Sequence, residues 1–154
     1  VRRRKSKMLA KLKSKLTLRN ILLLSSVVLL LVGWIIYLVV ATTGYFAGNT
    51  PNAAVVILSI FYILGALAFI SFDEKLQKFD TLFFFGLAAF IILAFVFFVL
   101  DKEAVIGDRL IPVNHPVKEV EAVKASITGI VFYLLSIILL IVSSFLSFKK
   151  KAAE

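Results

Sequence analysis

The chain has 154 residues, of which 61% are hydrophobic, and it carries a formal net charge of +9. Its apolar share and its mean hydropathy of +1.02 exceed those of a soluble globular domain, in which roughly half of the residues are apolar. The composition predicts an integral membrane protein. The absence of cysteine excludes a disulfide oxidoreductase of the four-helix kind, because that chemistry needs thiols.

The first twenty residues form a basic leader with half of all the basic residues and no acidic ones. Met8, Leu12 and Leu16 recur at four-residue spacing, which is typical of an amphipathic helix. Two interpretations stay open: an interfacial helix on the anionic inner leaflet, or a topology signal that is also helical. Because the rest of the chain is electrically neutral, nucleic-acid binding is not expected. The lipid-surface candidates are Arg2, Arg3, Arg4, Lys5, Lys7, Lys11, Lys13, Lys15 and Arg19.

Four hydrophobic blocks follow, each long enough to cross a hydrocarbon core about 30 Å thick, which takes about 20 helical residues. None of them contains Asp, Glu, Lys, Arg or His. The first is longer than the apolar run of a cleaved signal peptide, and a chain beginning at Val1 suggests an alternative start codon or trimming, with Met8 as a candidate start. We therefore predict an all-α antiparallel bundle of four transmembrane helices. The predicted spans are 21–43, 53–72, 81–100 and 127–148, followed by a basic tail, 149–154.

The distribution of basic residues predicts the orientation, because Lys and Arg near the ends of spans favour the cytosolic side. With both termini in the cytosol, the inner segments hold 14 Lys and Arg residues and the outer segments hold four. We expect a multi-pass protein of the cell membrane with both termini cytosolic.

Two short connections predict which spans are neighbours. The first, 44–52, is uncharged and rich in turn residues, so Gly44 and Gly48 are assigned to a turn and not to a helix-dimer motif. The second, 73–80, joins the second and third spans. Small residues at similar depth near the inner leaflet predict close helix packing. These candidates are Ser25, Ser26, Gly65, Ala66, Ala68, Gly86, Ala89, Ser143 and Ser144.

The outer half of the spans is rich in bulky aromatic residues. One hypothesis is a bundle that splays outward and offers a groove to lipid, ligand or a partner helix. The other, which we favour, is ordinary packing with large side chains turned to lipid, since small residues also occur in that half. The aromatic residues concerned are Trp34, Tyr37, Tyr62, Phe95, Phe97, Phe98, Phe132 and Tyr133.

Several functional classes are disfavoured by what the spans lack. Proton relays, ion pathways and carboxylate-driven exporters need ionisable groups inside the membrane, and the predicted spans have none. The spans also contain no histidine for haem and no ligand cluster for zinc or iron. We expect no enzyme activity, no cofactor and no metal.

The segment 101–126 is the longest polar stretch between spans, and we predict it to be an extracytosolic loop. Pro112 and Pro116 hold its middle extended. Val117, Val120 and Val123 then recur at three-residue spacing, which predicts a helix from Pro116. If this helix runs without a break into the fourth span and ends near Lys150, it has about 35 residues.

His115 is the only histidine in the chain. It could act as a base with Asp108 or Glu119, or as a metal ligand, but no nucleophile or second histidine accompanies it. Docking of a protein partner is the better interpretation, although the valines could equally rest on the outer ends of the bundle. The docking candidates are Ile111, Pro112, Asn114, His115, Pro116, Val117, Val120 and Val123.

Three stretches carry a resemblance: TTGYFAG at 42–48, IPVNHP at 111–116 and SITGIVFYLLSIILLI at 126–141. With them the chain resembles small four-span membrane proteins of Gram-positive bacteria, a group of uncharacterised function. The resemblance implies a bacterial cytoplasmic membrane and implies no activity, cofactor or site.

The residues together favour a non-catalytic accessory or scaffold subunit of a membrane complex, with membrane lipids and a protein partner or a second copy as partners. The first alternative is a small homo-oligomeric transporter or channel for an apolar or neutral solute. The second is holin-like permeabilisation of the membrane.

Overall fold

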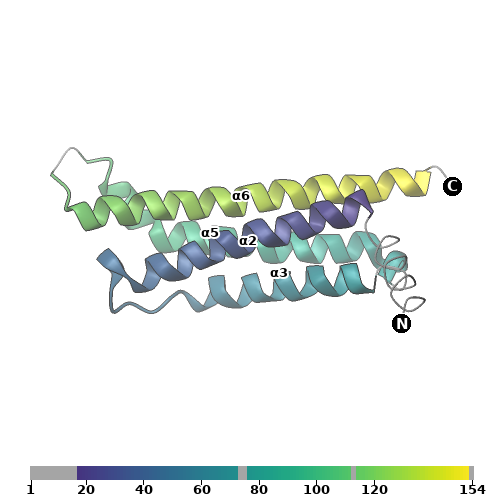
Figure 1. The fold of residues 1–154 in the computed structure, drawn as a ribbon, viewed down its shortest axis with the longest axis horizontal. Helices are drawn as coiled ribbons and strands as arrows, with labels where there is room; N and C mark the ends of the chain where they lie inside the picture. Colours follow the sequence, from purple (N-terminus) through teal and green to yellow (C-terminus); the bar gives the residue numbers. More distant parts are fainter. Residues whose placement is uncertain (1–16, 73–75, 112–113, 153–154) are drawn as a thin grey trace, which may run out of the picture.

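The computed structural model describes residues 17–72, 76–111 and 114–152, which form an all-α antiparallel four-helix bundle (Figure 1). Each long helix is long and apolar enough to cross a membrane, so the chain is a multi-pass membrane protein. The elements are α2 (Leu18–Thr42), η1 (Gly44–Phe46), α3 (Ala53–Ser71), η2 (Gln77–Phe79), α5 (Asp80–Asp108) and α6 (Val117–Ala152).

The four helices pack as two principal pairs. Helix α2 lies along α6, and α3 lies along α5, while α5 also packs against α6 and α2 touches α3 less extensively. Helix α2 begins and helix α6 ends at the same end of the bundle, which we call the basic end (right in Figure 1). The opposite end holds the connection between α5 and α6, and we call it the loop end.

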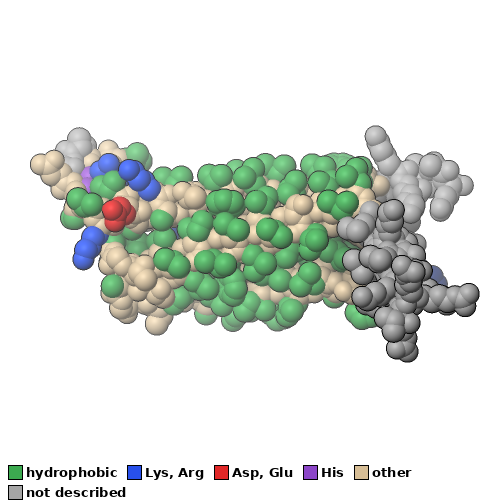
Figure 2. Space-filling model, in the orientation of Figure 1, with side chains coloured by type: hydrophobic (Ala, Val, Ile, Leu, Met, Phe, Trp, Pro, Cys, Tyr) green, Lys and Arg blue, Asp and Glu red, His purple; other side chains and the backbone are tan. Residues whose placement is uncertain are grey.

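Large apolar side chains are exposed on all four long helices, and they cover most of the face between the two ends that Figure 2 shows. Leu82 and Phe85 on α5 and Leu64 on α3 are examples of large hydrophobic residues that are more than half exposed. Such a surface is unfavourable in water but matches the hydrocarbon core of a bilayer. The four-span prediction from hydropathy is therefore confirmed.

The helix ends differ from the predicted span ends, notably in α5. This helix continues past Leu100 through eight further residues to Asp108, so 101–108 is helical and not part of a loop. No proline interrupts the helix there, and helical hydrogen bonds form whether or not lipid surrounds them. The predicted loop 101–126 was wrong in this respect, and the connection shrinks to 109–116.

The predicted helix from Pro116 is confirmed, and it continues without a break into the fourth span. The Pro116 carbonyl accepts hydrogen bonds from the backbone N–H groups of Glu119 and Val120 at 3.0 and 3.2 Å. Helix α6 then runs for 36 residues, about 54 Å at 1.5 Å per residue, and includes most of the predicted tail.

The connection between α2 and α3 is a tight turn, as predicted. Gly44 and Gly48 have φ angles of +62° and +92°, a conformation that residues with a side chain rarely adopt. Asn52 caps α3, because its side-chain oxygen accepts the backbone N–H of Ala54 at 2.9 Å.

The basic leader lies almost wholly outside the described residues, which begin at Thr17. Thr17 caps α2 by accepting the backbone N–H of Asn20. Arg19 is described, and its side chain does not face lipid. It is only 14% exposed and pairs with Asp80 of α5, so its assignment to a lipid surface was wrong.

Candidate functional site

The closest helix contact in the described residues lies along α2 and α6. A Cβ atom added to Gly33 would stand 3.1 Å from the Gly129 carbonyl oxygen and 3.0 Å from Phe132 Cβ. One added to Gly129 would meet Phe98 Cζ at 2.9 Å. Only glycine permits this approach of the two backbones.

Facing residues along this contact recur every seven positions on both helices, which is the spacing of a left-handed coiled-coil contact. We call this contact the α2–α6 seam. Its facing pairs, from the basic end to the loop end, are Arg19 with Ser143, Ser26 with Ser136, Gly33 with Gly129, and Val40 with Ala122.

Hydroxyl groups fix the register of the seam. Ser26 Oγ donates to the Ser136 carbonyl at 2.8 Å, and Ser136 Oγ donates to the Ser26 carbonyl at 2.7 Å. Tyr62 OH of α3 lies 2.6 Å from Ser26 Oγ. Because each serine has only one proton, the arrangement that satisfies every group has Tyr62 donating to Ser26.

Three fully buried tyrosines tie together helices that are not principal neighbours. Tyr62 of α3 bonds to α2, and Tyr133 of α6 reaches Ser59 of α3 with 2.7 Å between the hydroxyls. Tyr37 of α2 donates to Asp101 of α5 at 3.2 Å. A hydroxyl in hydrocarbon needs a partner, and these partners come from across the bundle.

Four of the eight aromatic residues fit neither of the two hypotheses. Tyr37, Tyr62, Phe98 and Tyr133 are all 0% exposed, and the Phe98 ring packs edge-on against Tyr37 and Tyr133 with centroids 4.7 and 5.3 Å apart. These four rings fill the centre of the bundle. They neither line an open groove nor face lipid.

At the loop end, α5 carries a buried ion pair. Lys102 Nζ lies 2.8 Å from Asp101 Oδ2, and the lysine is only 4% exposed. Its charge sits 4.1 Å from the centroid of the Phe46 ring and 5.5 Å from that of Tyr37. Tyr37 OH also accepts the backbone N–H of Asn52 at 2.7 Å, so this cluster ties the α2–α3 turn to α5.

A second ion pair lies at the basic end. Arg19 Nη1 of α2 donates to Asp80 Oδ2 at the start of α5 over 3.1 Å. The guanidinium also lies over the Phe69 ring of α3, 4.9 Å from its centroid. Asp101 follows Asp80 by 21 residues on α5, or about 32 Å. That length matches the ~30 Å of a hydrocarbon core, so the two pairs mark its boundaries.

The connection at the loop end is held by His115. Its Nδ1 lies 2.8 Å from Glu119 Oε1, and its Nε2 lies 3.1 Å from the Ile111 carbonyl oxygen. Both ring nitrogens therefore have acceptors within the chain. Of Asp108 and Glu119, the two acidic residues that the sequence suggested as partners, Glu119 is the one that contacts His115. The described residues contain no group of three His, Cys, Asp or Glu side chains that could hold a metal ion.

The predicted docking residues fall into three groups. Ile111 and Val117 are exposed by 54% and 72%, and Asn114 and Pro116 are exposed as well. Val120 is half-buried and Val123 is buried, so the valine face turns progressively into the bundle. Pro112 lies outside the described residues. Leu110, which the sequence reasoning did not single out, is 85% exposed.

The predicted helix-packing residues also differ in how deeply they are buried. Ser26, Ala66 and Ser143 are buried, and Gly65 approaches Leu87 of α5. Ser25, Ala68 and Ser144 are half-buried. Ala89 is exposed, and a Cβ added to Gly86 would meet no atom within 4 Å. The prediction of close approach at Gly86 and Ala89 was wrong, because α5 meets α3 through Leu87 against Gly65 and through the Phe83 ring against Phe69.

Sequence reasoning missed the seam itself and the two ion pairs. A signal for the seam was present: Ala122, Gly129, Ser136 and Ser143 recur every seven residues on the last span, as Ser26 and Gly33 do on the first. The ion pairs join residues just outside the predicted spans, where hydropathy alone marks a boundary and identifies no partner.

In comparison with known proteins, no family model, no curated protein and no solved structure matches this chain. The resemblance to small four-span proteins of Gram-positive bacteria therefore stays a prediction.

Proposed function

We propose that the chain is a non-catalytic accessory or scaffold subunit of a membrane complex, which docks through helix faces and through its loop end. The observation that carries the proposal is a group of exposed apolar side chains on the α5–α6 connection and the first turn of α6. We call Leu110, Ile111 and Val117 the loop-end apolar group; they are 85%, 54% and 72% exposed.

This group stands beyond the boundary marked by Asp101 and Lys102. Helix α5 continues past Lys102 for six residues to Asp108, about 9 Å at 1.5 Å per residue. Large apolar side chains that gather outside the hydrocarbon are a feature of interaction surfaces. The hydrogen bond between His115 and Glu119 ties the end of the connection to the first turn of α6, which lowers the entropic cost of binding.

The interior of the bundle supports the same proposal. The hydroxyls of Ser26, Ser59, Ser136 and the three buried tyrosines are hydrogen-bonded within the chain. Rings of tyrosine and phenylalanine fill the centre. A bundle built in this way is suited to present surfaces to a partner.

We also propose that the chain lies in a bacterial cytoplasmic membrane with both termini cytosolic, so that the loop-end apolar group is extracytosolic. The supporting observation is the 14 to four distribution of basic residues. A single cysteine in place of exposed Asn49 should react with an impermeant maleimide in intact cells, and one in place of exposed Lys78 should not. The opposite pattern would reverse the orientation.

The docking proposal is tested by purifying the full chain in mild detergent with each of two sets of changes. Leu110→Ser, Ile111→Ser and Val117→Ser together should abolish recovery of a stoichiometric partner. The matched control, Lys118→Ala, Glu121→Ala and Lys124→Ala, alters exposed polar residues at the same end and should leave recovery unchanged. Equal recovery with both sets would refute docking there. A homo-oligomer alone, with solute flux in liposomes, would favour the transporter alternative.

A further inference from the structure

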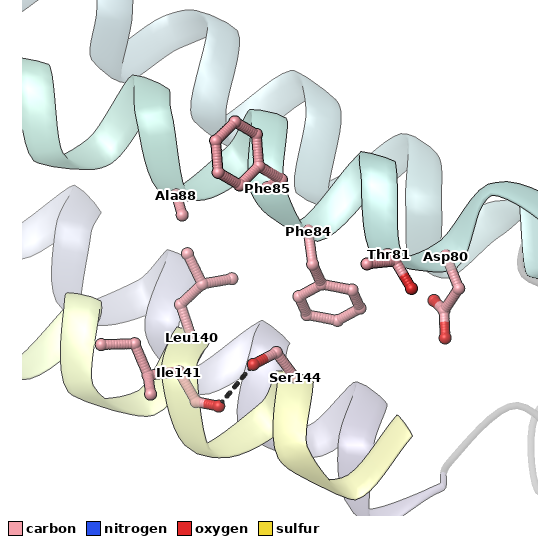
Figure 3. A pocket seen from close by; sticks show the side chains of 8 residues that line it. All are labelled: Asp80, Thr81, Phe84, Phe85, Ala88, Leu140, Ile141 and Ser144. Atoms are coloured by element: carbon pink, nitrogen blue, oxygen red, sulfur yellow. Dashed lines mark hydrogen bonds between the residues drawn. The ribbon is translucent and has the colours of Figure 1, made fainter. Parts of the chain in front are cut away.

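A pocket of about 240 Å³ lies between α5 and α6 at the basic end (Figure 3). It is smaller than the ~300 to 1,000 Å³ of a complete small-molecule site, so it suits part of a larger ligand. Its lining residues are Asp80, Thr81, Phe84, Phe85, Ala88, Leu140, Ile141 and Ser144.

The lining changes from polar to apolar along the helices. Asp80 and Thr81 lie at the start of α5, at the level of the ion pair with Arg19 that marks the hydrocarbon boundary. Phe84 and Ala88 follow toward the membrane centre and face Leu140 across the pocket (Figure 3). From Asp80 to Ala88 the helix rises about 12 Å. The pocket thus has a polar rim at the boundary and an apolar interior within the hydrocarbon.

The pocket is accessible from the lipid side of the bundle. Phe85 and Ile141, which line it, are 75% and 44% exposed, and Thr81 is exposed as well. The wall itself carries one ionisable group, Asp80, whose carboxylate is paired with Arg19 at 3.1 Å. An occupant therefore enters sideways from the bilayer, and the polar side chains of the lining are Asp80, Thr81 and Ser144.

A basic residue lies next to the rim, just before the start of α5. Lys78 of η2 is exposed two residues before α5 begins. Positive charge at the boundary, above an apolar pocket in the hydrocarbon, complements a lipid whose headgroup carries a negative phosphate.

We propose that this pocket binds one acyl chain of an anionic phospholipid, whose phosphate lies beside Lys78. The inference goes beyond the accessory role and does not depend on it. A bound lipid of this kind would fill the space between α5 and α6, where the two helices meet through fewer residues than α2 and α6 do.

The test uses the full chain in phosphatidylcholine vesicles that contain a minority of phosphatidylglycerol with a photoactivatable diazirine on its acyl chain. After illumination, adducts should concentrate on the peptides that carry Phe84, Phe85 and Ile141. Ala88→Leu fills the pocket from α5, and Ser144→Leu fills it from α6, so each should lower that labelling severalfold. Ala89→Leu is the matched control, since Ala89 is the exposed neighbour outside the lining.

Labelling spread evenly over the exposed apolar residues would overturn the proposal, as would an equal loss in all three variants. Two filling variants on different helices keep the test decisive if one of them fails to fold. The headgroup is tested by competition: unlabelled phosphatidylglycerol should displace the probe better than phosphatidylcholine, and Lys78→Gln should remove that preference. Equal competition by both lipids in the unaltered chain would refute the anionic headgroup.

Discussion

Small residues line the contact of α2 with α6, whereas phenylalanine rings make up much of the contact between α3 and α5. Along the seam, Gly33 faces Gly129. Ser26 faces Ser136, and the hydroxyl of each serine donates to the backbone carbonyl of the other. Between α3 and α5, Phe69 packs against Phe83 and Phe84 with ring centroids 5.3 and 5.1 Å apart. Directional bonds fix one register, while ring contacts tolerate small shifts.

The two helix pairs are expected to have different roles. The seam joins the first and last helices and closes the bundle, so it sets the shape of the whole chain. The α5 side carries the lipid-facing pocket and the strongly exposed Phe85 and Leu82. We expect lipids and partner helices to meet the protein on the α5 side, and substitutions in the seam to affect folding.

The largest effect should come from the seam glycines. Gly33→Ala and Gly129→Ala should each lower the free energy of unfolding by about 1 to 3 kcal/mol, because the new methyl group overlaps a backbone oxygen or a buried ring. Unfolding in mixed micelles with a rising fraction of sodium dodecyl sulfate measures the change.

The matched controls for these glycines lie in the other pair. Gly86→Ala meets open space and Gly65→Ala meets only the flexible end of Leu87, so both should be neutral or stabilising by up to about 1 kcal/mol through helix propensity. If the Gly65 and Gly86 variants lowered the free energy of unfolding as much as the Gly33 and Gly129 variants, the distinction between the two helix pairs would be wrong.

A smaller effect is expected from the serines. Ser26→Ala and Ser136→Ala remove hydrogen bonds between helices, which contribute about 0.6 to 1.7 kcal/mol each in membrane proteins. Ser25→Ala and Ser144→Ala are neighbouring controls, since those hydroxyls donate to the carbonyls of Ile21 and Ile141 in their own helices. The same unfolding assay should separate the two sets, and no difference between them would contradict the assigned bonds.

The smallest effect should follow Tyr133→Phe, which keeps the ring and loses the hydroxyl bond to Ser59 that links α6 to α3. We expect a loss of about 0.6 kcal/mol. Tyr45→Phe, at an exposed position of η1, should have no effect. If Tyr133→Phe left the free energy of unfolding unchanged, the bond to Ser59 would not join the two helix pairs.

Much of the fold could be predicted because its signal is local. Charge-free apolar runs locate all four helices, and Gly44 and Gly48 locate the first turn. The end of α5 could not be predicted, since hydropathy reports where lipid ends and the helix continues to Asp108. The neighbouring spans 53–72 and 81–100 suggested close contact at Gly86 and Ala89, yet the closest contact joins the first and last helices. Such long-range pairing leaves only a weak trace, the seven-residue spacing of small residues.

The candidate site could be predicted only in part, because long-range contacts decide which of its residues are buried. The exposed Ile111 and Val117 lie in the stretch that the sequence singled out, and Val123 does not remain at the surface. Which side of the first turns of α6 faces the bundle depends on α2 and η1, which lie far away in the sequence.

The claim that α2 and α6 close the bundle through one fixed seam can be tested by a disulfide. The chain has no native cysteine, and the Oγ atoms of Ser26 and Ser136 are 2.8 Å apart, so cysteines at these two positions should lie within bonding reach. Oxidation of the double variant Ser26→Cys, Ser136→Cys in membranes should give a fast-migrating monomer on a non-reducing gel. The control pair Ser26→Cys, Gly86→Cys should not. Failure of the first pair, or a crosslink only between molecules, would contradict the account.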